Sequence, residues 1–182
     1  MLSAVAVGKA YEAAIARRLA HAGCSLTALG GAFDQCVDLA GTWALPAPPA
    51  RRAPPWPGDA VQLLCTVTAA APAAPADALP PPPPLLLAVV VQCKATRSPA
   101  GVGTMREFVH AVAARFPEDT LAVLACTGGF SWRSLRRERE WATRDVLLLH
   151  TTPSGGVLGL LHLRQMGAAE RLPVTFSSAP LA

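Results

Sequence analysis

The chain lacks the cysteine and histidine patterns of a zinc site. None of its five cysteines forms a C-x-x-C pair, and each lies in or beside an apolar segment. They are Cys24, Cys36, Cys65, Cys93 and Cys126. The four histidines, His21, His110, His150 and His162, lie far apart in the sequence. We therefore expect buried free thiols in a reducing compartment rather than disulfides, and neither zinc nor histidine-based catalysis.

Long apolar runs are also absent. No stretch of about 18 apolar residues is free of a breaker, so no membrane span is expected. The N-terminus shows neither a signal peptide nor the long Arg- and Ser-rich leader of an organelle import sequence. The amphipathic segment 11–19 carries arginines, but we interpret it as part of a domain helix.

Lysine is scarce, although the chain is basic. The formal net charge is +4, and lysine occurs only at Lys9 and Lys94. The abundant arginine suits phosphate recognition because its planar fork donates two hydrogen bonds at once, although the codon usage of a GC-rich genome is an alternative explanation. With 182 residues, of which 52% are hydrophobic, the chain is long and apolar enough for one folded domain. Lys94 is informative because it ends an apolar segment.

The hydrophobic periodicity predicts helices and strands in alternation. Helices are expected over 3–22, 105–116 and 131–143. Strands are expected over 24–29, 37–45, 61–68, 85–92, 121–126 and 146–150, with a strand or a short helix over 157–163. Gly30-Gly31 predicts a tight turn between the first two strands, which then form a hairpin. This order favours an α/β sandwich around a mixed sheet, in which 85–92 is central and covered on both faces.

Two proline-rich segments interrupt the pattern. Residues 46–57 are expected to be a loop, and the Ala- and Pro-rich segment 69–84 a flexible or polyproline spacer on the surface. A polyproline ligand for another domain is the alternative. We expect one domain over 1–166, interrupted by the insert at 69–84, and a C-terminal tail over 167–182. Replacing the insert with a short Gly/Ser linker is expected to leave the thermal midpoint nearly unchanged.

A possible site for phosphodiester cleavage combines the start of one strand with the end of another. Asp38 is the best metal ligand, and Gln92 and Lys94 share a strand face because alternate side chains point the same way. The amide oxygen of Gln92 and the carbonyl of Cys93 are further oxygen ligands for Mg²⁺, with Mn²⁺ as the alternative ion. Lys94 would orient the water or stabilise the developing charge, and Glu12 would add an outer carboxylate.

Each of these residues also has a simpler interpretation. Asp38 could cap a turn or pair with an arginine, and Glu12 could be a solvated helix residue. Gln92 and Lys94 could mark a strand that emerges into water. Five arginines could contact phosphates around the site or form solvated helix faces: Arg97, Arg106, Arg133, Arg136 and Arg137. No basic patch with interleaved aromatic residues indicates stacking on single strands.

Several short motifs occur in an order that resembles a known family. They are Tyr11-Glu12, Gly30-Gly31-x-x-Asp34-x-x-x-Asp38-Leu39-x-Gly41-x-Trp43, Val91-Gln92-Cys93-Lys94 and Arg106-Glu107-Phe108. The set resembles the Mrr-like branch of the PD-(D/E)xK nuclease superfamily. Within that branch, the Asp-Leu-x-Gly-x-Trp and Gln-Cys-Lys motifs are most similar to the fungal mitochondrial family named required for respiratory growth protein 7. The resemblance covers about residues 8–166.

The resemblance implies a restriction-endonuclease-like fold, which is a three-layer α/β sandwich with a central mixed sheet. Asp38 matches the metal-ligand aspartate, Lys94 the motif lysine and Glu12 the acid of the first helix, while Gln92 stands where many relatives carry Glu. Two departures are that Gln35 replaces an expected turn glycine and that the insert between Asp38 and Gln92 is unusually long.

The resemblance also implies a function. It points to a Mg²⁺-dependent nuclease-like protein, of the type IV Mrr-like endonuclease kind, that acts on nucleic acid, in the first place DNA. It implies a mitochondrial location and a part in mitochondrial genome maintenance or respiratory growth. The alternatives are a catalytically inactive nucleic-acid-binding or structural member of the same fold, and a scaffold with no nucleic-acid role. The sequence leaves the oligomeric state and the choice between endonuclease and exonuclease open.

Overall fold

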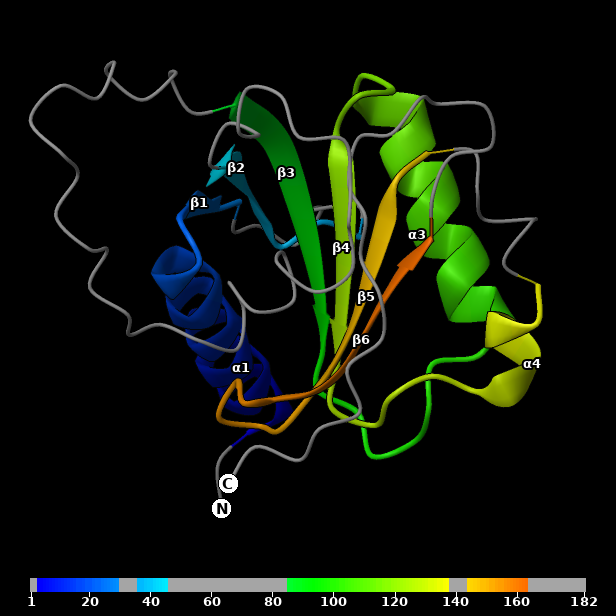
Figure 1. Ribbon diagram of the computed structural model, residues 1–182. Helices are drawn as coiled ribbons and strands as arrows, with labels where there is room; N and C mark the ends of the chain where they lie inside the picture. The colour runs from blue at the N-terminus through cyan, green and yellow to red at the C-terminus, as the bar shows by residue number, and fades with distance from the viewer. Residues whose placement is uncertain (1–2, 30–35, 46–84, 138–143, 164–182) are drawn as a thin grey trace, which may run out of the picture.

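A six-stranded mixed sheet flanked by helices forms the centre of the protein in a computed structural model, which describes residues 3–29, 36–45, 85–137 and 144–163 (Figure 1). The helices are α1 (Ala4–His21), α3 (Val102–Arg115) and the short α4 (Trp132–Leu135). The strands are β1 (Cys24–Ala28), β2 (Leu39–Leu45), β3 (Leu85–Lys94), β4 (Leu121–Cys126), β5 (Val146–Thr151) and β6 (Val157–Leu163).

The strands lie side by side in chain order, from β1 to β6. β3, β4 and β5 run parallel to one another, whereas β1–β2, β2–β3 and β5–β6 are antiparallel pairs. The parallel pairs require crossover connections, and α3 and α4 lie in those connections. The carboxyl ends of β3 and β4 therefore meet at one edge of the sheet.

Helix α1 covers one face of the sheet, and its boundaries follow from the sequence. The hydroxyl of Ser3 accepts the N–H of Ala6 at 3.2 Å and so caps the first turn. The helix stops at Gly23, which has a φ of 90° and donates its N–H to the carbonyl of Ala20 at 3.0 Å. These two signals place β1 directly after the helix, so that α1 lies back against the sheet.

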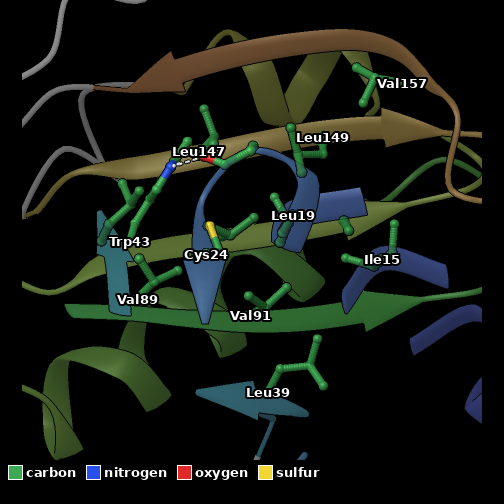
Figure 2. Close-up of a cluster of buried hydrophobic side chains, with 14 of the residues drawn as sticks. Ile15, Leu19, Cys24, Leu39, Trp43, Val89, Val91, Leu147, Leu149 and Val157 are labelled. Atoms are coloured by element: carbon green, nitrogen blue, oxygen red, sulfur yellow. Dashed lines mark hydrogen bonds between the residues drawn. The ribbon is translucent and has the colours of Figure 1, made fainter. Parts of the chain in front are cut away.

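The core under α1 consists of apolar side chains from the helix and from alternate positions of the strands (Figure 2). Ile15 and Leu19 recur at helical spacing and are at most 1% exposed. They pack in one cluster with Leu39, Val91 and Leu149 from three different strands. Burying each such side chain stabilises the fold by about 1.5–3 kcal/mol.

The second core lies on the other face of the sheet, beneath α3 (Figure 1). Met105, Phe108 and Val112 of α3 are fully buried and pack with alternate strand residues such as Val90 and Leu124. Since β3 contributes Val89 and Val91 to one core and Val90 to the other, it is covered on both faces, which confirms the prediction for this apolar strand.

The predicted elements match the structure closely, with one correction. The helix expected over 131–143 is wrong in its length, because α4 ends at Leu135 and residues 136–137 form a turn. Residues 138–143 of that range lie outside the described residues. The segment 157–163 is a strand. The strand expected over 61–68, the turn at Gly30-Gly31, the loop 46–57, the insert 69–84 and the tail 167–182 lie outside the described residues.

Candidate functional site

The chain enters β2 through an irregular turn at Asp38. Cys36, just before it, has a left-handed φ of 72°. The N–H of Asp38 donates to the carbonyl of Val91 at 2.9 Å, although Val91 is the register partner of Leu39. Asp38, just before β2, and Leu39, the first residue of β2, thus both face Val91 of β3, an arrangement that resembles a β-bulge. A bulge re-aims the side chain that it carries, and here that side chain is a carboxylate.

The irregularity is visible in the packing on either side of Asp38. Val37 belongs to the core beneath α3, whereas Leu39, only two residues later, belongs to the core beneath α1. Residues two apart in a regular strand share a face, so the alternation is broken between these two. Asp38 is half-buried between them at the edge of the sheet.

The carboxylate of Asp38 accepts a hydrogen bond from the backbone of β3. Its Oδ2 lies 2.6 Å from the N–H of Cys93. If the antiparallel pairing of β2 and β3 continued, a backbone carbonyl would accept the hydrogen bond from the N–H of Cys93. The carboxylate of Asp38 accepts it instead. The N–H and C=O of one strand residue point to the same side, so the carbonyl of Cys93 also faces the start of β2. The structure therefore brings Asp38 to the backbone of Cys93, the middle residue of the Gln-Cys-Lys segment.

Gln92 and Lys94 lie on either side of Cys93 in β3. Cys93 packs against the core beneath α1, so by alternation Gln92 and Lys94 face the side of α3. Gln92 is only 3% exposed, while Lys94 is half-buried. Lys94 pairs in register with Cys126 of β4, and its charge lowers the pKa of that thiol, although burial dominates and raises it.

Glu12 approaches the same strand from α1. It is half-buried, and its charge, together with that of Asp38, adds to the burial that raises the pKa of the Cys93 thiol. Glu12 and Asp38 therefore both lie close to Cys93. Burial and the two nearby acids therefore favour the protonated form of this thiol at neutral pH.

Tyr11, beside Glu12 in the sequence, has a structural role that the sequence alone did not indicate. It is 2% exposed, and its hydroxyl is hydrogen-bonded to Oγ1 of Thr151 in β5 at 2.5 Å. Burial raises the pKa of this phenol, so it remains neutral. The bond fixes α1 on the sheet at the turn that carries Glu12. The sequence signal for this role was the four-residue spacing of Tyr11 and Ile15, which places both side chains on one helix face.

The donors at this site are hard oxygen groups. Within the described residues, no three His, Cys, Asp or Glu side chains are grouped to hold a metal ion. The oxygen groups that meet at the start of β2 are the Asp38 carboxylate and the Cys93 carbonyl, and Glu12 lies nearby. Such oxygen donors suit Mg²⁺, which commonly takes one or two carboxylates and completes its shell with water and substrate phosphate. The amide of Gln92 lies on the α3 side of the strand.

The arginines singled out in the sequence are exposed. Arg97 follows β3, Arg106 lies in α3, and the other three lie in or just after α4: Arg133, Arg136 and Arg137. Arg136 lies over the ring of Trp132, 5.1 Å from its centre. The basic residues after β3 and β4 therefore gather at the sheet edge where Lys94 also lies.

The comparisons with known proteins give one match, to a family model. The model of the family described as required for respiratory growth protein 7 matches residues 3–140. No curated protein and no solved structure matches the chain. In the described part of the chain, no helix is both long and apolar enough to cross a membrane. The family match spans α1, the Asp38 turn, all of β3 and the start of the segment after α4.

Proposed function

The chain belongs to the required for respiratory growth protein 7 family, and from that premise we propose that it is a metal-dependent nuclease-like protein. On this proposal it acts on nucleic acid, in the first place DNA, in mitochondria, and supports respiratory growth. The fold is proposed to be restriction-endonuclease-like, in the Mrr-like branch of the PD-(D/E)xK superfamily. The mixed sheet with helices on both faces is compatible with that fold.

One observation carries the proposal. The carboxylate of Asp38, re-aimed by the bulge, lies 2.6 Å from the backbone N–H of Cys93, the central residue of Gln-Cys-Lys. These groups are 55 residues apart in sequence. A structural aspartate in a turn would satisfy its own local backbone instead. The contact therefore supports a site that joins the two motifs at the sheet edge.

Each residue of the site has a proposed task. Asp38 and the carbonyl of Cys93 would hold Mg²⁺, which supplies an activated water and charge stabilisation when bound. Lys94 would orient the water or stabilise negative charge on the phosphate. Glu12 would hold an outer-shell water through its carboxylate. Gln92 would position its neighbours from the α3 side of the strand, or serve as a weaker ligand after rotation of its amide.

The direct test is a Mg²⁺-dependent cleavage assay on DNA with wild type beside Asp38→Asn. We expect cleavage to be abolished, because the substitution removes the charge that holds the metal, while binding is largely retained through arginine contacts to phosphates. Asp119→Asn is the matched control, because Asp119 is an exposed aspartate before β4, at the other end of the sheet. Equal cleavage by wild type and Asp38→Asn would show that the site is misassigned.

Two further variants assign roles within the site. Lys94→Ala is expected to abolish cleavage and leave binding largely intact. Gln92→Glu restores the carboxylate found in many relatives of the superfamily that the sequence resembles, and is expected to keep or raise activity if Gln92 is a ligand. A large loss of activity in Gln92→Glu, with folding unchanged, would contradict the assignment of Gln92 as a metal ligand.

The second candidate is a non-catalytic nucleic-acid-binding member of the same fold. Two observations favour it: Gln92 replaces the carboxylate, and its side chain is 3% exposed and faces away from Cys93. On this hypothesis the wild type binds nucleic acid with a steep dependence on salt, and never cleaves it with Mg²⁺ or Mn²⁺.

A further inference from the structure

Trp132 is one of the largest exposed apolar side chains of the described residues. It is the first residue of α4, and 67% of its surface is exposed. The guanidinium of Arg136, one helical turn later, lies over the indole at 5.1 Å from the ring centre. A tryptophan that served only the core would be buried like Trp43, which is 5% exposed. The stacked arginine instead holds the ring at the surface.

The position of Trp132 is fixed by hydrogen bonds to the loop that follows β3. The N–H of Ser131 and the hydroxyl of Ser134 both donate to the carbonyl of Ala100, at 3.0 and 2.9 Å. Ser134 is fully buried, and the hydroxyl of Ser131 accepts its N–H at 3.2 Å. Ser131, which precedes α4, and Ser134, within α4, are thus anchored to the loop after β3, and Trp132 follows Ser131 directly in the sequence.

The same loops connect Trp132 with the candidate site. The N–H of Thr127, which follows β4, donates to the carbonyl of Lys94 at 3.1 Å, and its hydroxyl donates to the carbonyl of Thr96 at 2.7 Å. The N–H of Ala100 donates to Gly129 at 2.8 Å. Gly128 approaches this loop so closely that a Cβ there would lie 2.3 Å from the carbonyl oxygen of Ser98. Figure 1 shows α4 at the end of the molecule where β3 and β4 finish.

The described segments next to Trp132 are basic. The described segments 95–104 and 127–137, which make up the two loops, the start of α3 and α4, contain four arginines and no acidic residue. Arg97, Arg133 and Arg136 are all exposed. A flat aromatic ring among guanidinium groups matches the chemistry of a nucleic-acid strand, in which planar bases alternate with phosphates.

We propose that Trp132 and these arginines form a binding surface for single-stranded nucleic acid. An unpaired base would stack on the accessible indole surface, and Arg97, Arg133 and Arg136 would contact the adjacent phosphates. Stacking requires an unpaired base because in a duplex both faces of each base are covered by neighbouring bases. The inference rests on the proposed function for its ligand class, and it adds that the substrate is single-stranded where it crosses α4.

The test is a fluorescence-anisotropy titration with a labelled oligothymidylate, in EDTA so that no strand is cut. Trp132→Ala is expected to weaken binding about 10-fold, since removing one stacking side chain has effects of that order. Trp132→Tyr, which keeps an aromatic face, is expected to retain most of the affinity. Arg136→Ala is expected to weaken binding and to reduce its dependence on salt.

Arg115→Ala is the matched control. Arg115 is also an exposed arginine over an aromatic ring, 5.8 Å from the centre of Phe116, but it lies at the far end of α3. Its removal changes the net charge equally and is expected to leave oligothymidylate binding near wild type. A loss equal to that of Arg136→Ala would show that only net charge matters and would overturn the proposal.

The outcomes separate this inference from the proposed function. The proposed binding surface would be wrong if Trp132→Ala bound oligothymidylate with wild-type affinity. It would also be wrong if the protein bound a duplex of the same length more tightly than the single strand. Either result is independent of cleavage, which is assayed separately with Mg²⁺ in wild type and Asp38→Asn. Tight binding that depends on Trp132 in a protein that never cleaves would support the surface and refute the nuclease.

Discussion

The indole N–H of Trp43 donates to the backbone carbonyl of Ala22 at 2.7 Å, and so ties β2 to the end of α1 (Figure 2). Trp43 is also the last residue of the Asp-Leu-x-Gly-x-Trp motif, whose first residue, Asp38, is the candidate metal ligand. Between them, Leu39 packs in the core beneath α1, and Gly41 permits a close approach of β1. Most of this motif is therefore explained by folding, and Asp38 is the residue to which we assign the proposed function.

The Trp43 hydrogen bond should be measurable as stability. In Trp43→Phe the carbonyl of Ala22 loses its buried donor and the smaller ring leaves space, so we expect the free energy of unfolding to fall by about 1–3 kcal/mol. Urea denaturation measures the change. Trp132→Phe, at an exposed position, is the control and should change stability by less than about 0.5 kcal/mol. Equal effects at the two positions would show that the bond to Ala22 contributes nothing.

Gly41 is required by the distance between β1 and β2. A Cβ at this position would lie 1.8 Å from the carbonyl oxygen of Ser25, which is backbone and cannot move aside. Gly41→Ala is expected to destabilise the protein by about 4 kcal/mol or more, because the hairpin must separate.

A second glycine provides the control for that substitution. Gly103 lies in α3, and a Cβ there would meet nothing within 4 Å. Gly103→Ala should therefore stabilise the protein by about 0.5–1 kcal/mol, through the higher helix propensity of alanine. Thermal unfolding of both variants checks the pair, and a stable Gly41→Ala protein would contradict the hairpin geometry.

The contact between Asp38 and Cys93 predicts different effects for two substitutions on folding. Asp38→Asn keeps a side-chain oxygen that can accept the N–H of Cys93, whereas Asp38→Ala leaves that half-buried N–H without its partner. We expect Asp38→Ala to be about 1–3 kcal/mol less stable than Asp38→Asn, and the amide of Cys93 to exchange faster with solvent. Identical exchange rates in the two variants would contradict the hydrogen bond.

The sequence predicted the parts of the fold that local patterns determine. The apolar run of β3 identified a central strand because burial on both faces removes alternation, and Ser3 and Gly23 marked the ends of α1. The length of α4 was overestimated because arginine-rich helical periodicity continues past Leu135, while the structure turns there. No sequence pattern shows where a short helix stops when neither glycine nor proline marks it.

For the candidate site, the sequence predicted that Asp38 and the Gln-Cys-Lys segment meet, but it did not predict the geometry of their contact. Alternation placed Gln92 and Lys94 on one face, and the motif order brought Asp38 near Cys93. The bulge at Asp38 could not be predicted, since it depends on the pairing of β2 with Val91 across the sheet. The exposure of Trp132 was missed for a related reason, because only the tertiary bonds of Ser131 and Ser134 to Ala100 turn that ring outward.

Two buried thiols give the fold a defined dependence on pH. Burial raises the pKa of Cys24 and of Cys126 from 9.0 to about 12. Cys126 is fully buried in β4, among the side chains beneath α3. The unfolded chain loses these thiol protons at a lower pH than the folded chain does. Stability is therefore at its full value below about pH 9 and is lost as the pH rises toward 12.

Replacing one thiol should reduce that loss. Between pH 8 and pH 10.5, Cys126 alone is expected to account for about 2 kcal/mol of the decrease in unfolding free energy, because each pKa unit corresponds to about 1.4 kcal/mol. Cys126→Ala should therefore show a shallower decrease than wild type in urea titrations over this range, whatever its stability at pH 7. Val123→Ala is the control, because it removes core packing from the same strand without removing a titrating group. Val123→Ala should lower the unfolding free energy at every pH and keep the wild-type dependence on pH. If Cys126→Ala also kept the wild-type dependence on pH, this thiol would ionise equally in the folded and unfolded chains.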